Sequence, residues 1–159
     1  MMPTGRSYLL RETAISMGIN AVLSAVFVFL IFRGKTKIGL WGAGGLAFDF
    51  VPQTFMVALM AALVPTLLTR KAARKGSVPA GPAFAARLPG NAFVRALLVA
   101  VTITAVGVPL AILVVDVSSP GGLLFSAVLV AKVIYGTSLA CIVTPVAIRA
   151  ALADGVGIA

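Results

Sequence analysis

Lys132 stands near the middle of the last long apolar run of the chain, Gly122–Ile148. A charged side chain at membrane depth is costly, so it usually has a partner or a task. Lys132 lies ten residues past Gly122, about 15 Å along a helix that rises about 1.5 Å per residue. This places it close to the middle of a bilayer and makes it the first candidate for substrate binding or ion coupling.

Asp49 and Gln53 are the candidate partners of Lys132. Their i, i+4 spacing places them on one face of a helix in the second apolar run, Leu46–Leu68. Counted from the glycine pairs that precede the two runs, Lys132 lies six residues deeper than Asp49, an axial gap of about 9 Å. An extended lysine side chain covers much of this gap. The pair is open to two interpretations: a coupling or substrate-binding pair, or a lysine that only snorkels or fixes helix packing.

Polar residues form a stripe along one face of the helix expected for the first apolar run, Thr13–Phe32. Its members are Glu12, Ser16, Asn20 and Ser24, at successive i+4 positions. Glu12 and Asn20 carry the strongest polar groups of the stripe, so we include them among the candidates for substrate or ion coupling.

Four apolar runs of membrane-spanning length account for most of the chain. Hydrophobic residues make up 60% of the 159 residues and charged residues 11%, whereas soluble domains have about 25% charged residues. The runs are Thr13–Phe32, Leu46–Leu68, Ala92–Val115 and Gly122–Ile148, and a spanning helix needs about 20 residues. The first run is longer than a signal-peptide core and is expected to be retained. We predict an all-α polytopic membrane protein, residues 1–159 forming one membrane domain of four transmembrane helices.

The chain also resembles two copies of one helical hairpin. Gly44–Phe48 (GGLAF) recurs as Gly121–Phe125 (GGLLF), 77 residues later, and Pro65 recurs near the end of the fourth run as Pro145. We predict tandem repeats over about residues 13–75 and about 92–152. Two spans per repeat keep both copies in one orientation, so the hairpins should superpose about an axis along the membrane normal.

Basic residues set the predicted orientation. Nine of the 13 lie on the side that would carry both termini and the loop 69–91, and three lie on the other side. Cytoplasmic loops carry the excess of Lys and Arg, so we predict cytoplasmic N- and C-termini in the inner (plasma) membrane. The net charge of +9 therefore reflects topology and anionic lipid, and we expect no nucleic-acid partner.

The composition also excludes several kinds of chemistry. The chain has no histidine and one cysteine, Cys141, so a Ser-His or Cys-His nucleophile, a histidine-ligated haem and an internal disulfide cannot form. We expect no catalytic residue, cofactor or metal, and hence no enzyme.

Two functions remain. The first is a non-enzymatic accessory, scaffold or assembly partner of a membrane complex, indicated by the sparse polar interior. The second is a small transporter or proton-coupled permease, acting alone or as a dimer, indicated by the duplication and by Asp49, Lys132 and Glu12. The expected partners are the lipid bilayer and either a second copy or a larger membrane complex.

Overall fold

A computed structural model describes residues 5–78 and 88–154 of the chain. In chain order its elements are α1 (Gly5–Phe32), β1 (Lys37–Ile38), α2 (Leu46–Arg74), α3 (Ala92–Ser118), β2 (Leu123–Leu124) and α4 (Phe125–Ala153). Helix makes up 81% of the described residues, and each of these four helices is long and apolar enough to span a membrane. The predicted all-α polytopic fold is confirmed.

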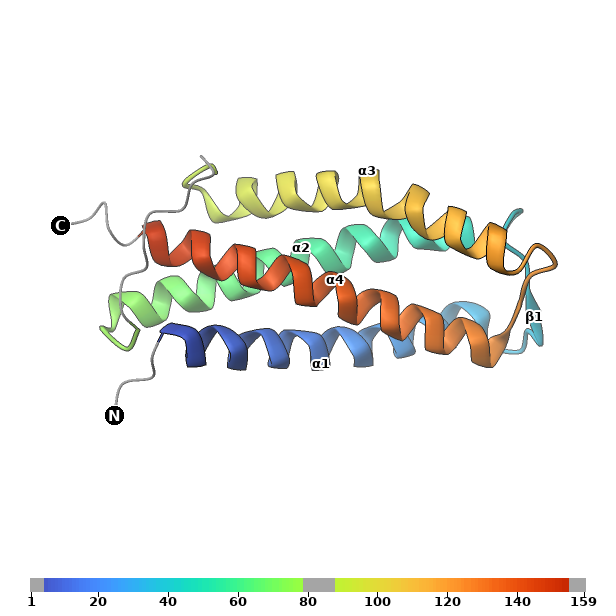
Figure 1. Ribbon diagram of the computed structural model, residues 1–159, viewed down its shortest axis with the longest axis horizontal. Coiled ribbons are helices and arrows are strands. Elements are labelled where there is room, and N and C mark those ends of the chain that lie inside the picture. Colours follow the sequence, from blue (N-terminus) through green and yellow to red (C-terminus); the bar gives the residue numbers. More distant parts are fainter. Residues whose placement is uncertain (1–4, 79–87, 155–159) are drawn as a thin grey trace.

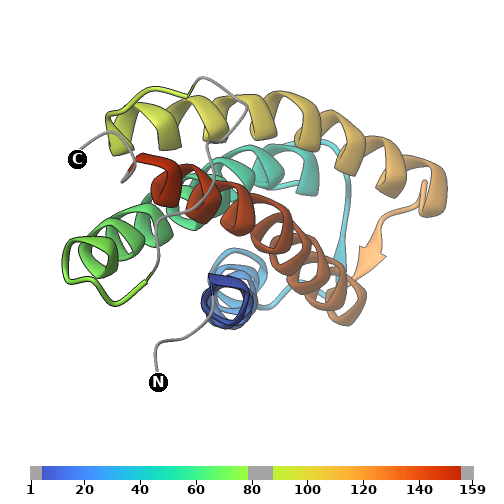
Figure 2. The ribbon, with the colours of Figure 1, turned by 60° about the vertical axis from the view of Figure 1, so that its left-hand side comes forward.

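The four helices lie along the long axis of an elongated bundle (Figure 1). We call the end where α1 begins and α4 ends the terminal end, and the end that holds β1 and β2 the ribbon end. Helix α4 packs against α1 and α2, and α3 packs on the other side of α2 (Figure 2). The two helices within each predicted hairpin touch little: α1 has few contacts with α2, and α3 has still fewer with α4. Each predicted hairpin is therefore open, and a helix of the other hairpin completes its packing.

The helices extend beyond the apolar runs, because those runs mark only the part of a helix that lipid surrounds. α1 begins at Gly5 and α2 continues to Arg74, whereas α4 begins at Phe125, later than predicted. The predicted start at Gly122 was wrong because Leu123 and Leu124 form a strand. They pair with Ile38 and Lys37 in a two-stranded antiparallel ribbon.

Gly122 allows the ribbon to form beside the start of α4. Its φ is +88°, and a Cβ at this position would lie 2.7 Å from the Ile38 carbonyl oxygen. Glycine is the residue that tolerates both conditions. The ribbon joins the two interhelical connections at this end of the bundle, which ties the end of α1 to the start of α4.

The predicted duplication stays a prediction. The first glycine of the first pair, Gly44, has a positive φ of 75°, but in the second pair it is the second glycine, Gly122. The two second helices begin 79 residues apart, at Leu46 and Phe125, so the spacing of 77 between the GGLxF motifs differs from the spacing of the helices by two residues. The spacing of the helix starts is closer to the 80 residues that separate Pro65 from Pro145.

Small residues in α2 and α4 bring the helix backbones close together. Ala58, Ala62 and Ala140 are fully or almost fully buried, and Gly136 is buried one turn before Ala140. Small residues at i, i+4 spacing allow helices to approach in membranes. Such pairs can serve either packing within one bundle or a dimer, and the structure places these inside the bundle.

Gly136 provides the first test of this packing. A Cβ on Gly136 would overlap the Ser24 hydroxyl on α1, and Ser24 cannot turn away without losing the hydrogen bond that it accepts from Gln53. We expect Gly136→Ala to lower the free energy of unfolding by about 1–3 kcal/mol, as overpacking does, measured by denaturation in detergent.

Gly18 supplies the matched control, because a Cβ there meets no atom within 4 Å. Gly18→Ala should be neutral or slightly stabilising, since alanine favours helix over glycine. Adding Ser24→Ala to Gly136→Ala removes the overlapping oxygen and should recover part of the loss. Equal stability of Gly18→Ala and Gly136→Ala would contradict the close approach of α1 and α4.

Candidate functional site

Lys132 is enclosed by the bundle, with its side chain 1% exposed. Its ammonium group donates hydrogen bonds to Asp49 Oδ2 and Gln53 Oε1, and Nζ lies 4.1 Å from the ring centroid of Phe50. All three partners are on α2, which packs against α4, the helix that carries Lys132. The ion pair that the sequence made feasible is present, and the lysine does not snorkel to the membrane surface.

The axial gap between Asp49 and Lys132 is smaller than the value of about 9 Å predicted from the positions of the glycine pairs. Lys132 is the seventh residue after the first residue of α4, and Gln53 is the seventh after the first residue of α2. Gln53 is therefore level with Lys132, and Asp49 is one turn nearer the ribbon end, a gap of about 6 Å. The lysine bridges one helical turn and reaches both acceptors.

Gln53 connects this ion pair to α1. Its Oε1 accepts from Lys132, while its Nε2 donates to Ser24 Oγ at 3.2 Å. One amide thus links three helices, because its two ends have opposite hydrogen-bonding character. A second link between α2 and α4 lies alongside it, where Thr54 Oγ1 and Tyr135 Oη are 2.8 Å apart.

The structure does not bring Glu12 to this cluster. Ser16 is hydrogen-bonded to Thr144 at 2.8 Å, and Ser24 contacts Gly136. The two helices α1 and α4 are therefore antiparallel, and each residue forward on α1 corresponds to one residue back on α4. Glu12 is then level with Ile148, sixteen residues from Lys132, or about 24 Å along the helix. Its carboxylate instead pairs with Arg11 at 2.9 Å, so its inclusion with Lys132 and Asp49 was wrong.

By the same register, Asn20 on α1 is level with Ala140 on α4, about two helical turns from Lys132. Asn20 does not contact Lys132. Its Nδ2 donates to the backbone oxygen of Ser16 at 2.8 Å, and its Oδ1 is buried without a hydrogen-bond partner. Asn20 lines a cleft of about 220 Å³ between α1 and α2. The cleft is present because these two helices hardly touch at this level.

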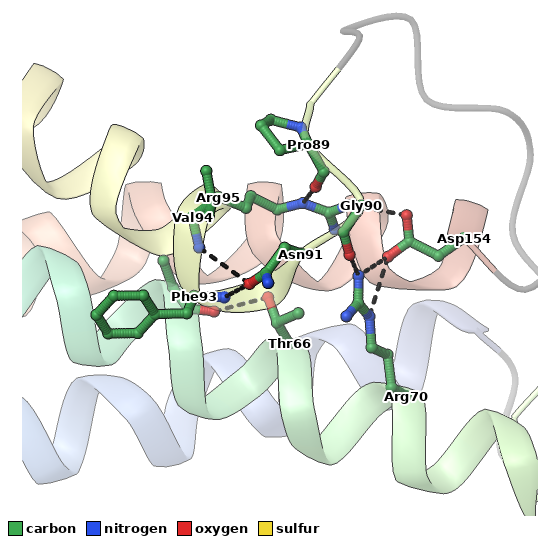
Figure 3. A network of polar contacts seen from close by, with 10 residues as sticks. Thr66, Arg70, Pro89, Gly90, Asn91, Phe93, Val94, Arg95 and Asp154 are labelled. Carbon is green, nitrogen blue, oxygen red and sulfur yellow. Dashed lines mark hydrogen bonds and ion pairs between the residues drawn. The ribbon is translucent and has the colours of Figure 1, made fainter.

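A second charged cluster, at the terminal end, was not among the predicted sites (Figure 3). Arg70 Nη2 lies 2.6 Å from Asp154 Oδ2, and Arg95 Nη2 lies 2.7 Å from Asp154 Oδ1. Arg95 also donates from Nε to the Pro89 carbonyl at 3.0 Å. Asp154 thus joins the end of α4 to α2 and to the start of α3. The sequence did hold a signal for this cluster. Asp154 is one of only four acidic residues in the chain, it lies shortly after the fourth apolar run, and the second and third runs have arginines at their ends on the same side.

The two arginines also set the protonation of Asp154. Partial burial raises the pKa of this carboxyl, but hydrogen bonds from Arg95 and Arg70 and their positive charges outweigh burial and hold the pKa below its ordinary value of 3.8. Charged partners favour the ionised form of a carboxyl group. Asp154 is therefore an anion that holds three helices together.

The contacts of Lys132 join α4 to α2 and, through Gln53, to α1. Within residues 5–78 and 88–154, no three acidic, cysteine or histidine side chains come together to hold a metal ion.

No protein-family model matches the chain, and neither a curated protein nor a solved structure does.

A double-mutant cycle tests the pair of Lys132 and Asp49. Lys132→Ala leaves Asp49 buried without its counter-charge, a loss of about 3–5 kcal/mol for a buried pair. Adding Asp49→Asn should recover much of this loss, because no unpaired charge remains. Thermal or denaturant unfolding in detergent measures the coupling between the two changes.

Arg11 and Glu12 provide the control cycle, since the Arg11 side chain is 69% exposed. Their coupling should be below about 1 kcal/mol. If the effects of Lys132→Ala and Asp49→Asn simply add, the buried pair contributes no coupling and the interpretation of Lys132 is wrong.

Acid should weaken the cluster at Asp154. Its folded pKa lies below the unfolded value of 3.8, so its contribution to stability is complete above that pH and is lost as the pH falls through the lowered pKa. We expect Asp154→Asn to lower the melting temperature near neutral pH and to reduce the fall in melting temperature on acidification below about pH 4.

Asp116 is the matched control, because its side chain is exposed near the end of α3. Asp116→Asn should leave the pH profile of the melting temperature unchanged. A profile that falls as steeply in Asp154→Asn as in the parent protein would show that the cluster does not contribute to acid sensitivity.

Proposed function

We propose that the protein is a non-enzymatic accessory, scaffold or assembly partner of a membrane complex, embedded by its four helices. The observation that carries this proposal is the closed environment of Lys132. Its ammonium group is hydrogen-bonded to Asp49 and Gln53, and it faces Phe50, so its partners all come from its own chain. A coupling lysine needs a state in which a ligand or proton reaches it, whereas a packing lysine needs only the contacts that Lys132 has.

The distribution of hydrogen bonds also supports a structural role. Thr144 bonds to Ser16 and to the carbonyl of Ala61, and Tyr8 lies 3.3 Å from Thr69 near the terminal end. These contacts join helices at several depths. Such interhelical hydrogen bonds contribute about 0.6 kcal/mol each on average in membranes, which suits a stable frame for assembly.

One observation favours the alternative of a small transporter or proton-coupled permease. Gln53 touches Lys132 and also lines the cleft between α1 and α2. A ligand in the cleft would therefore be one side chain away from the ion pair. In this alternative Asp49 and Lys132 are the coupling residues, and a second copy of the chain completes the transporter.

We further propose that the protein lies in the inner (plasma) membrane with its terminal end in the cytoplasm. The excess of basic residues on that side supports this orientation. Reporter fusions at the C-terminus and after Gly76 should both give cytoplasmic signals, and a fusion after Gly42 should give a signal from the opposite side. A periplasmic signal from either of the first two would overturn the orientation.

Purification of the tagged full-length chain in mild detergent tests the assembly role. We expect the protein to co-purify with at least one larger membrane protein in a fixed ratio, and we expect Lys132→Ala with Asp49→Asn to retain that partner when folded. Arg11→Ala is the control for removal of a positive charge elsewhere, and it should also retain the partner.

An isolated dimer that supports solute or proton flux in reconstituted vesicles would instead favour the transporter. That outcome requires Lys132→Ala to abolish flux while the protein stays folded, and Arg11→Ala to leave flux intact. Co-purification without flux would exclude the transporter, and flux without a partner would exclude the assembly role.

A further inference from the structure

The connection between α1 and α2, residues 33–45, carries three of the 13 basic residues of the chain at the ribbon end (Figure 1). They are Arg33, Lys35 and Lys37, and all three are exposed. In the orientation proposed above, this end faces away from the cytoplasm, where an excess of Lys and Arg is not expected. The rule that accounts for the basic residues of the terminal end therefore leaves these three unexplained.

No acidic side chain pairs with these three cations within the described residues. Of the four acidic residues in the chain, three are already paired elsewhere, with Arg11, with Lys132 and with the two arginines of the terminal end. The fourth, Asp116, lies near the end of α3 and forms no ion pair in the described part of the chain. The ribbon end therefore has three positive charges against one negative charge.

The backbone that carries these cations is held in place by the ribbon and by α2. Ile38 is 1% exposed and Leu40 is 6% exposed, and β1 is paired with β2. The backbone N–H groups of Leu46 and Ala47 donate to the carbonyl groups of Gly39 and Leu40. We call residues 33–45 the basic platform. Because its backbone is already fixed, a ligand that binds to it has little chain to order.

The two lysines of the basic platform lie over the two connections that meet at the ribbon. Lys35 Nζ is 5.6 Å from the centroid of the Phe32 ring and donates to the Gly44 carbonyl at 3.2 Å. An ammonium group has three donors, so this contact leaves two for a ligand. Lys37 Nζ lies 3.6 Å from where a Cβ on Gly121 would be, on the connection between α3 and α4.

The basic platform follows directly after an uncharged span of membrane length. Residues 13–32 of α1 contain no charged side chain and are about 30 Å long as a helix, which is the thickness of the hydrocarbon layer. The platform then starts at the level expected for lipid headgroups. Trp41 on the platform is 68% exposed, and Phe48 in the first turn of α2 is 78% exposed. An exposed tryptophan is typical of the membrane–water interface.

We propose that the basic platform binds the phosphate headgroups of anionic lipids through Arg33, Lys35 and Lys37. Arginine and lysine side chains bind phosphate, and clusters of them at a membrane surface attract acidic lipid. An acidic segment of another protein would meet the same charges, but the exposed Trp41 and Phe48 at this level favour lipid. The proposal does not depend on the assembly role, because the purified chain alone is expected to select the lipid.

Trp41 is the only tryptophan of the chain, so its fluorescence reports on the lipid beside the basic platform. The full-length chain is reconstituted in phosphatidylcholine vesicles that contain a constant minor fraction of phosphatidylglycerol. The vesicles differ only in which lipid carries bromine, a short-range quencher, near the start of its acyl chains: the phosphatidylglycerol or an equal amount of the phosphatidylcholine. Both leaflets have the same composition, so the direction of insertion does not affect the result.

We expect phosphatidylglycerol to associate with the surroundings of Trp41 about fivefold more strongly than phosphatidylcholine, the factor that about one cation near an anionic surface provides. Equal quenching by the two brominated lipids would overturn the proposal. Salt tests the cause on the unaltered protein, because the Debye length falls from about 10 Å at 0.1 M to about 3 Å at 1 M. The preference should fall with added salt, and a preference that salt does not change would contradict binding by the cations.

Two triple variants locate the binding. The first replaces the cations of the basic platform: Arg33→Gln, Lys35→Gln and Lys37→Gln. The control removes the same number of exposed cations from the opposite end of α2: Lys71→Gln, Arg74→Gln and Lys75→Gln. The first should abolish the lipid preference at Trp41 and the control should retain it. Equal loss in both variants would show a response to net charge and would contradict a site on the platform.

An acidic segment of a partner protein is the competing occupant. Purification of the unaltered chain and of the platform variant from native membranes distinguishes it from lipid. The lipid proposal expects any co-purified protein to remain in the platform variant. Loss of a co-purified protein in that variant, together with equal quenching by the two lipids in the unaltered chain, would overturn the proposal and assign the platform to that protein.

Discussion

A charge buried inside an apolar helix bundle has no water to solvate it, and this constraint determines how α2 and α4 are placed. Lys132 can remain ionised there only if a counter-charge lies within hydrogen-bond distance. Asp49 supplies that charge, and Gln53 and Phe50 complete the surroundings of the ammonium group. Sliding α4 along α2 by one turn would separate the charges, so the pair fixes the axial register of the two central helices.

The outer helices depend on that register. Gly136 faces Ser24, and Ser24 in turn accepts from Gln53, so the position of α1 is tied to the same amide that accepts from Lys132. At the terminal end Asp154 holds the start of α3 through Arg95 and the end of α2 through Arg70. The chain therefore uses two charged clusters for two tasks, one to align the central helices and one to gather three helix ends.

The sequence was informative where a single physical cost dominates. Runs of apolar residues predicted the four spans, and the cost of a buried charge predicted the pairing of Lys132 with Asp49. Periodicity places a residue on a face but not at a depth relative to another helix, and for this reason Glu12 was grouped with residues about 24 Å away. The ribbon of two-residue strands gives no periodic signal. The exchange of partners between hairpins depends on side-chain fit, which a pattern of apolar runs does not contain.

The buried ion pair and the cleft between α1 and α2 share one residue, Gln53. Gln53 contributes its oxygen to Lys132 and its nitrogen to Ser24, and it forms part of the cleft wall. A ligand that drew the amide toward the cleft would remove an acceptor from Lys132 and leave Asp49 as its remaining hydrogen-bond partner, at a cost that rises in low dielectric. An apolar occupant that leaves this amide in place would therefore not disturb the ion pair. The contact that holds α2 to α4 thus depends on the orientation of the Gln53 amide and not on the apolar side chains that line most of the cleft.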